Sequence, residues 1–192
     1  GVGNRMHSKD IPKQFLLVAG KPIIIYTLEK FETSDEVDKI VLVCKDGYED
    51  ILSGYINQFR LKKVAAIVRG GDTRQDSLYQ GVVAARKLSS NPDEDIVLIH
   101  DAVRPAVSLE LISKTIEMAK IHKAVISVGR PIETIMIIGD DGFVKEVKNR
   151  NICRTGKAPH AYNLDLLSSI FEKSRADGKL SYIDDESMMY DY

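Results

Sequence analysis

The run DIVLIH, residues 95–100, is followed at once by DAVRP, residues 101–105. An uninterrupted apolar and β-branched run of this kind is typical of a strand that is covered on both faces. Similar runs at residues 39–44, 65–68 and 124–128 predict three more strands, and amphipathic stretches between the runs predict helices. This alternation predicts an α/β fold with a mostly parallel sheet.

The predicted helices lie between and after these strands. The predicted helices cover residues 22–32, 48–58, 72–88, 108–120, 163–173 and 184–190. Asp72 and Ser108 precede two of them, and side chains of this kind accept a hydrogen bond from the free N–H groups at a helix start. We therefore predict Asp72 and Ser108 as N-caps.

The region from 131 to 155 interrupts the alternation. Residues 134–138 form an apolar run, the sequence GDDG at 139–142 suits a hairpin turn that needs positive φ, and residues 143–147 form the expected return strand. An isolated two-stranded hairpin is marginally stable in water. The hairpin is therefore expected to pack either on a partner subunit, which we favour, or back on its own domain.

Size and charge restrict the classes of function. A chain of 192 residues suits a single domain (1–192) with a substantial core. Its 27 Lys and Arg residues nearly balance its 28 Asp and Glu residues, so the basic excess needed for a nucleic-acid or membrane-surface role is missing. Two lone cysteines, Cys44 and Cys153, indicate a reducing, cytoplasmic location, and no apolar run approaches the length of a membrane span.

The first candidate site is the sequence GVGNRM at 1–6, read together with IPKQF at 11–15. Gly1 and Gly3 allow backbone N–H groups to approach a ligand, and Arg5 and Lys13 add two cations. One interpretation is a loop that wraps a nucleotide triphosphate. The other is a mobile tail with solvated charges.

The second candidate site is the loop at the carboxyl end of the 95–100 strand, where open α/β sheets bind ligands. Asp101 can hold Mg²⁺ together with phosphate oxygens, and Arg104 can bind an anion; alternatively, the two form a structural pair. The histidines show no metal-binding spacing.

Two further loops are candidates for anion or base contacts. The sequence GGDTRQDS at 70–77 feeds a helix N-terminus, where Gly71, Asp72 and Ser77 could meet an anion or a base edge, although Asp72 as a helix cap is the simpler reading. Arg150, in the sequence NRN at 149–151, could bind the phosphate of a second substrate or remain solvated.

These motifs occur together in one known family. The glycine loop with Arg5, the PKQF element at 12–15, the GDTRQDS element at 71–77 and the HDAVRP element at 100–105 resemble, in order and spacing, the cytidylyltransferases that act on polyol phosphates. The two branches are 2-C-methyl-D-erythritol 4-phosphate cytidylyltransferase, of isoprenoid precursor synthesis, and ribitol-5-phosphate cytidylyltransferase, of teichoic-acid synthesis. The resemblance covers nearly the whole chain.

The resemblance implies a Rossmann-like nucleotidyltransferase fold whose protruding β-arm, at about 131–155, reaches into a second subunit of a homodimer. It implies that a polyol phosphate attacks the α-phosphorus of CTP with Mg²⁺ present, and that pyrophosphate leaves. By residue, it assigns catalysis to Arg5 and Lys13; CTP binding to Gly1, Gly3, Gly71, Asp72 and Ser77; metal binding to Asp101; and polyol binding to Arg104, Thr134 and Arg150.

The sequence also departs from the family pattern. Ala158-Pro159-His160 stands where the family usually has Thr-Pro-Gln, and the first strand and C-terminal end of the family are expected to be missing from the chain. We expect the methylerythritol branch, with ribitol 5-phosphate as the alternative acceptor. A nucleotide-binding relative without catalysis, and an enzyme of the same architecture that uses UTP or GTP, remain alternatives.

Overall fold

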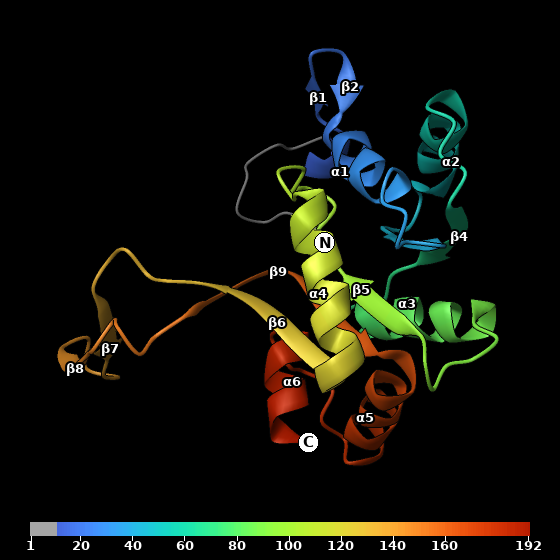
Figure 1. Cartoon of the computed structure of the whole chain (residues 1–192). Helices are drawn as coiled ribbons and strands as arrows, with labels where there is room; N and C mark the ends of the chain where they lie inside the picture. The colour runs from blue at the N-terminus through green and yellow to red at the C-terminus, as the bar shows by residue number, and fades with distance from the viewer. Residues whose placement is uncertain (1–10) are drawn as a thin grey trace.

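A computed structural model describes residues 11–192 (Figure 1). The N-terminal half contains η1 (Lys13–Phe15), β1 (Leu17–Val18), β2 (Lys21–Pro22), α1 (Ile23–Glu32), β3 (Ile40–Cys44), α2 (Glu49–Gln58), β4 (Val64–Arg69) and α3 (Arg74–Leu88). The C-terminal half contains β5 (Ile96–Ile99), α4 (Leu109–His122), β6 (Ala124–Gly129), β7 (Ile135–Ile138), β8 (Val144–Lys148), β9 (Thr155–Asn163), α5 (Leu164–Ala176) and α6 (Asp185–Asp191).

The strands pair in a mixed arrangement. β3 and β4 are parallel, whereas β9 lies between β5 and β6 and is antiparallel to both. The α/β class is confirmed, but a mostly parallel sheet is not confirmed for residues 11–192. The reason is β9, which was not predicted because its sequence, TGKAPHAYN, lacks a β-branched run.

Burial of apolar side chains fixes the helices around these strands. One buried cluster joins α1, α2 and β3, and includes Ile25 and Leu52; a second joins α3, β9, α5 and α6, and includes Tyr162 and Phe171. α4 lies across the three-stranded sheet in Figure 1 and buries Ile112 completely. These clusters hold the loops at the ends of β4 and β5 in place.

One of the two N-cap predictions is confirmed. Ser108 Oγ accepts from the backbone N–H of Leu111 at 3.1 Å at the start of α4. The prediction of Asp72 as an N-cap was wrong, because the cap of α3 lies one residue later than expected. Thr73 is the N-cap, and its Oγ1 accepts from the N–H of Asp76 at 3.0 Å.

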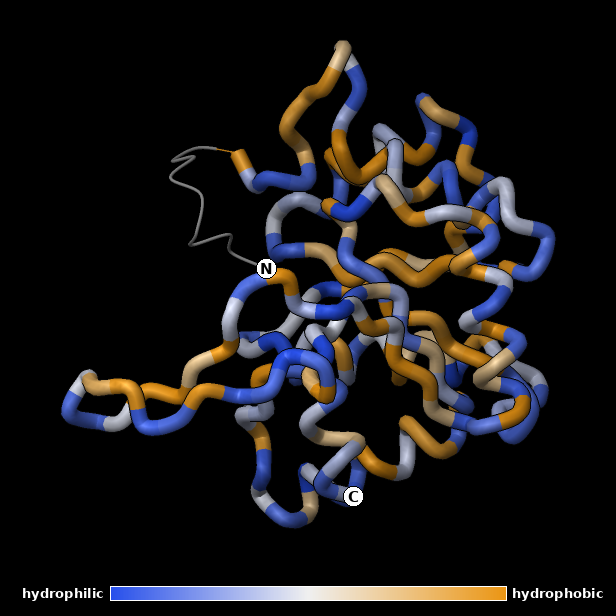
Figure 2. The backbone as a smooth tube through the Cα atoms, turned by 60° about the vertical axis from the view of Figure 1, so that its left-hand side comes forward, coloured by the Kyte–Doolittle hydropathy of each residue, from blue (hydrophilic) through white to orange (hydrophobic). Residues whose placement is uncertain are grey.

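The predicted hairpin is formed by β7 and β8. Its turn closes with a hydrogen bond from Gly142 N–H to the carbonyl of Gly139 at 2.9 Å, and Gly142 has φ +81°. In Figures 1 and 2 the hairpin stands away from the other elements, and Figure 2 shows hydrophobic and hydrophilic positions interleaved along it. Large apolar side chains on and beside it are exposed: Ile132, Met136, Ile137, Ile138, Phe143, Val144, Val147 and Ile152.

Candidate active site

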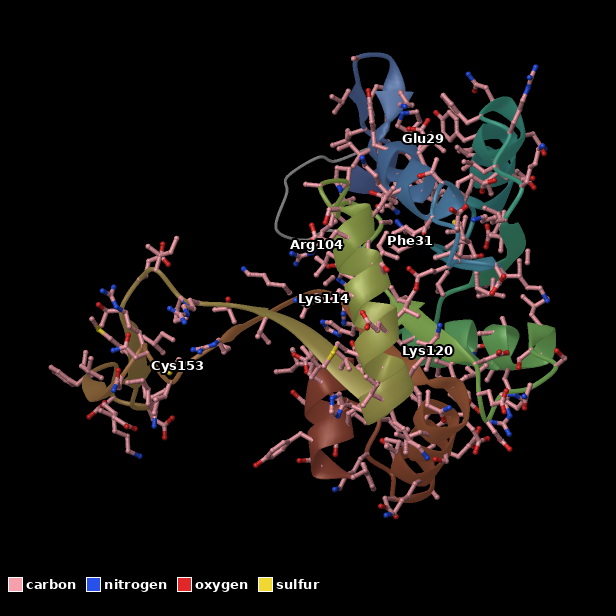
Figure 3. The ribbon with its side chains drawn as sticks, in the orientation of Figure 1. Glu29, Phe31, Arg104, Lys114, Lys120 and Cys153 are labelled. Carbon is pink, nitrogen blue, oxygen red and sulfur yellow. The ribbon has the colours of Figure 1, made fainter. Side chains whose placement is uncertain are left out.

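The loop after β5 carries an ion pair at its centre. Arg104 Nε donates to Asp101 Oδ2 at 2.6 Å, and the other oxygen, Oδ1, lies 3.7 Å from Nη1 of Arg74. Figure 3 shows Arg104 beside the N-terminal end of α4. Burial raises the pKa of Asp101, but the hydrogen bond and charge of Arg104 and the charge of Arg74 outweigh it, so the pKa is lowered and the carboxylate is ionised at neutral pH.

Arg74, the first residue of α3, connects this loop with a second carboxylate. Its Nη2 lies 3.6 Å from Oδ1 of Asp185, whose side chain is fully buried at the start of α6. Arg74 lies within the 71–77 motif, and no role was predicted for it from the sequence. Its partners lie on separate segments, and only the fold brings them together.

Asp185 is held by two further side chains from β9. His160 Nδ1 lies 2.7 Å from Asp185 Oδ2, and the Tyr162 hydroxyl donates to the same oxygen at 2.9 Å. Burial and the Asp185 charge raise the pKa of Tyr162, so its hydroxyl remains a donor. No role was predicted for His160 from the sequence, because its partner Asp185 lies 25 residues further along the chain.

His160, Asp185 and Glu186 place potential ligand atoms within 4.8 Å of one another. A metal-bound imidazole needs a lone pair on a ring nitrogen, yet both nitrogens of His160 already contact oxygen acceptors. This cluster is therefore an ion-pair network and a poor cation site. The carboxylate of Asp101 is better suited to Mg²⁺, because its side chain is 35% exposed and, among residues 11–192, the contact of its Oδ1 is the 3.7 Å ion pair with Arg74.

The loop between β4 and α3 is fixed by its own hydroxyl. Ser77 Oγ accepts from Gly71 N–H at 3.2 Å, and Gly70 N–H donates to the carbonyl of Cys44 at 2.7 Å. The loop is thereby tied to the ends of both parallel strands. Asp72 is exposed beside it. Contacts of Gly71, Asp72 and Ser77 with cytosine or ribose remain predictions.

Gly71→Ala is expected to distort this loop. A Cβ at residue 71 would lie 2.3 Å from Asp76 Cβ, so the backbone must shift. Overpacking of this kind costs roughly 1–3 kcal/mol, and we expect weaker CTP binding and a lower melting temperature. Calorimetric titration with CTP and thermal melting measure both. Gly54→Ala in α2 is the control, because its Cβ meets no atom within 4 Å; equal losses in both variants would contradict the steric argument.

Lys13 lies on η1, which is anchored by Phe15. The ring of Phe15 stacks on Tyr48 with 5.4 Å between centroids, and the Lys13 side chain is partly exposed. α1 joins η1 to the second candidate loop, since it packs on η1 and its Thr27 hydroxyl donates to the carbonyl of Ala102 at 2.8 Å. The predicted residues Gly1, Gly3 and Arg5 lie outside the described residues.

The two predicted polyol-binding residues beside the hairpin lie away from the loop after β5 of the same chain. Thr134 is exposed just before β7, and Arg150 donates from Nη1 to the carbonyl of Ile132 at 2.8 Å, closing the base of the hairpin. The hairpin stands away from the loop after β5 in Figure 1. The structure therefore brings Asp101 and Arg104 together and leaves Thr134 and Arg150 apart from them.

Comparison with known proteins identifies the family of this chain. The sequence matches the family described as IspD: 2-C-methyl-D-erythritol 4-phosphate cytidylyltransferase over residues 1–191. The chain belongs to the IspD family. It is an IspD-family cytidylyltransferase, and the resemblance drawn from the sequence motifs is confirmed.

Relatives in the IspD family carry two names. The chain is 38% identical to ribitol-5-phosphate cytidylyltransferase of Vibrio parahaemolyticus, and it covers 80% of that protein with 100% of its own length. It is 37% identical to 2-C-methyl-D-erythritol 4-phosphate cytidylyltransferase of Clostridium botulinum, covering 81% of that protein, again with its whole length. The crystal structure of 4-diphosphocytidyl-2C-methyl-D-erythritol synthase from Anaerococcus prevotii superimposes with a TM-score of 0.78 at 30% identity, over 91% of this chain and 73% of that one.

No helix among residues 11–192 combines the length and the apolar character needed to cross a membrane.

Proposed function

We propose that this chain transfers the cytidylyl group of CTP to 2-C-methyl-D-erythritol 4-phosphate and releases pyrophosphate. The observation that carries the proposal is the row of ion pairs that joins Arg104 and Asp101, in the loop after β5, with Arg74 at the start of α3. The protein that carries it matches the IspD family over residues 1–191. Two guanidinium groups around one ionised carboxylate form a site suited to phosphate-bearing substrates.

The proposed reaction needs charge stabilisation more than covalent help. A phosphate oxygen of the polyol phosphate forms a bond to the α-phosphorus of CTP, while the bond from that phosphorus to the bridging oxygen of the leaving pyrophosphate breaks. Lys13 and Arg5 neutralise the negative charge that grows on the transferred and leaving groups. Arg104 binds the polyol phosphate, and the loop of Gly71, Asp72 and Ser77 receives the cytidine, together with Gly1 and Gly3.

Mg²⁺ is proposed to bind Asp101. The ion prefers one or two carboxylates with phosphate oxygens as its other ligands, and the lowered pKa of Asp101 keeps that carboxylate ionised. When bound, Mg²⁺ supplies charge neutralisation for the triphosphate. EDTA is expected to stop turnover, and excess Mg²⁺ to restore it.

Ribitol 5-phosphate is the second candidate acceptor. The observation that favours it is the set of relatives named ribitol-5-phosphate cytidylyltransferase at 36–38% identity over 98–100% of this chain. It would place the reaction in teichoic-acid or capsule synthesis, whereas methylerythritol phosphate would place it in cytoplasmic isoprenoid precursor synthesis.

An acceptor comparison tests the proposal. Pyrophosphate release is measured with CTP, Mg²⁺ and each of the two polyol phosphates, and a larger kcat/KM with methylerythritol phosphate is expected. Larger turnover with ribitol 5-phosphate would establish the second candidate. Tight CTP binding without release for either acceptor would indicate a nucleotide-binding protein without catalysis, and equal use of UTP or GTP would overturn the choice of nucleotide.

We further propose that the chain forms a homodimer through the β7–β8 hairpin. The support is the exposed apolar side chains of the hairpin, such as Phe143 at 75% and Ile152 at 81% exposure, since an apolar surface of this kind on an extended element indicates an interaction site. In such a dimer, Thr134 and Arg150 of one subunit would reach the polyol phosphate bound by the other.

Mixing of inactive variants tests the shared site. A Lys13→Ala subunit keeps an intact hairpin, and a Thr134→Ala/Arg150→Ala subunit keeps an intact Lys13. Hybrid dimers would contain one site with both intact parts, so mixing is expected to restore up to about a quarter of wild-type activity, given random exchange and one complete site in each hybrid. Confirmed subunit exchange without recovered activity would contradict the shared site.

A further inference from the structure

The imidazole of His160 is enclosed by oxygen atoms on both sides. Its Nδ1 lies 2.7 Å from Asp185 Oδ2, and its Nε2 lies 2.6 Å from the carbonyl oxygen of Lys157 and 3.2 Å from Oε1 of Glu186. The side chain is only 6% exposed. A neutral imidazole donates from one nitrogen, whereas an imidazolium donates from both. The contacts therefore describe a protonated, positively charged ring.

This charge is the first of four in a row that alternate in sign. His160 faces Asp185. Oδ1 of Asp185, which has no hydrogen-bond partner among residues 11–192, lies 3.6 Å from Arg74, and Arg74 lies 3.7 Å from Asp101. Arg74 is therefore attracted by two carboxylates at nearly equal distances. Its position depends on how fully each carboxylate is neutralised by its other partner, and for Asp185 that partner is His160.

We propose that His160 is a positioning residue whose positive charge neutralises Asp185 and thereby leaves Arg74 shared with Asp101 at the substrate loop. The inference rests on the proposed function, because that function makes the loop the place where substrate binds. Loss of the proton would remove the nearest positive charge from the buried Asp185 carboxylate and leave it with the Tyr162 hydroxyl and Arg74. Arg74 would then be drawn toward Asp185 and away from Asp101.

The groups around His160 determine the pH at which this happens. Burial lowers the pKa of His160, but the hydrogen bond and charge of Asp185, the charge of Glu186 and the Lys157 carbonyl outweigh it, so the pKa is raised. Tyr162 faces the same Asp185 oxygen and remains protonated. The positioning effect is therefore complete at low pH and is lost as the pH rises through the raised pKa of His160.

Two neighbouring groups have shifted pKa values of their own. Burial lowers the pKa of His100, so this ring loses its proton at a lower pH than His160 does. Burial raises the pKa of Glu186, and the charge of His160 opposes that rise.

NMR titration tests the charge without any turnover. The imidazole signal of His160, assigned by its loss in His160→Gln, is expected to titrate above the ordinary value of about 6.5. The Arg74 guanidinium signal, assigned with Arg74→Lys, should shift with the same midpoint, and this shift should vanish in His160→Gln. A midpoint at or below the ordinary value, or an Arg74 signal that does not follow it, would overturn the proposal.

Kinetics separate positioning from a purely structural role. His160→Gln keeps a polar side chain at this position and removes the charge. We expect its kcat/KM to fall about tenfold below wild type at pH 6, the factor for one pKa unit of coupling, and to converge with wild type above the raised pKa. His122→Gln, an exposed control at the end of α4, should match wild type throughout.

The outcomes are distinct. A His160→Gln deficit that stays constant across pH would show a structural role and overturn the proposal. If the wild-type protein forms no CDP-polyol with any acceptor, the proposed function fails, and the paired titration of His160 and Arg74 still decides whether the charge positions the guanidinium.

Discussion

Lys13→Ala is expected to lower kcat by about 10²–10³-fold, the usual range for the loss of one preorganised group that stabilises transition-state charge. The ammonium group extends from η1, whose Phe15 stacks on Tyr48, so the backbone that carries Lys13 is held in place before substrate binds. The negative charge it opposes grows during the reaction. CTP affinity should therefore fall much less than kcat.

Steady-state kinetics and a separate CTP titration measure the two effects. Lys120→Ala is the matched control, because it removes the same charge from the end of α4 opposite the substrate loop (Figure 3). We expect it to behave like wild type. An unchanged kcat in Lys13→Ala would refute the catalytic role, and an equal loss in both variants would indicate a general effect of surface charge.

The parts of the fold that depend on local sequence were predictable. The apolar run before Asp101 and the helix after Ser108 were located because their hydrophobic periodicity and cap are encoded within a few residues. The turn around Gly142 was predicted for the same reason, since its positive φ requires a particular residue type at a particular position.

The parts that depend on distant segments were not predictable in this way. β9 has no apolar run, and its place between β5 and β6 is decided by pairing with strands more than 25 residues away. His160 and Arg74 acquire their roles from one buried carboxylate on α6. No spacing rule relates these residues, because the sequence carries each of them on a separate element and only the packing of α3, β9 and α6 joins them.

The same carboxylate leads to the largest expected effect on stability. Asp185→Ala should lower the free energy of unfolding by about 3–5 kcal/mol, because removal of one partner from a buried ion pair leaves the others without compensation. In this chain the affected groups are His160, the Tyr162 hydroxyl and Arg74. A loss of this size in a domain of this length corresponds to a fall in melting temperature of roughly 10 °C.

The dependence of this loss on pH identifies its origin. The pKa of Asp185 is lowered: burial opposes the shift, and the hydrogen bond and charge of His160 outweigh it. The contribution of Asp185 to the free energy of unfolding is thus present above about pH 3.8, the ordinary aspartate pKa, and is lost as the pH falls through the lowered pKa. The pKa of His160 is raised, so its contribution is lost as the pH rises through that value. The difference between wild type and Asp185→Ala should be largest between these limits.

Urea denaturation from pH 3 to pH 9 measures that window. Asp46→Ala is the control, because Asp46 pairs with Arg69 at 2.5 Å on the surface, with both side chains at least 60% exposed. Exposed pairs contribute about 1 kcal/mol or less, so this variant should lose little at any pH. A deficit in Asp185→Ala that did not narrow toward pH 9 would show that the contribution of Asp185 to stability does not depend on the titration of His160. The Tyr162 hydroxyl and Arg74 would then be the partners that account for the loss.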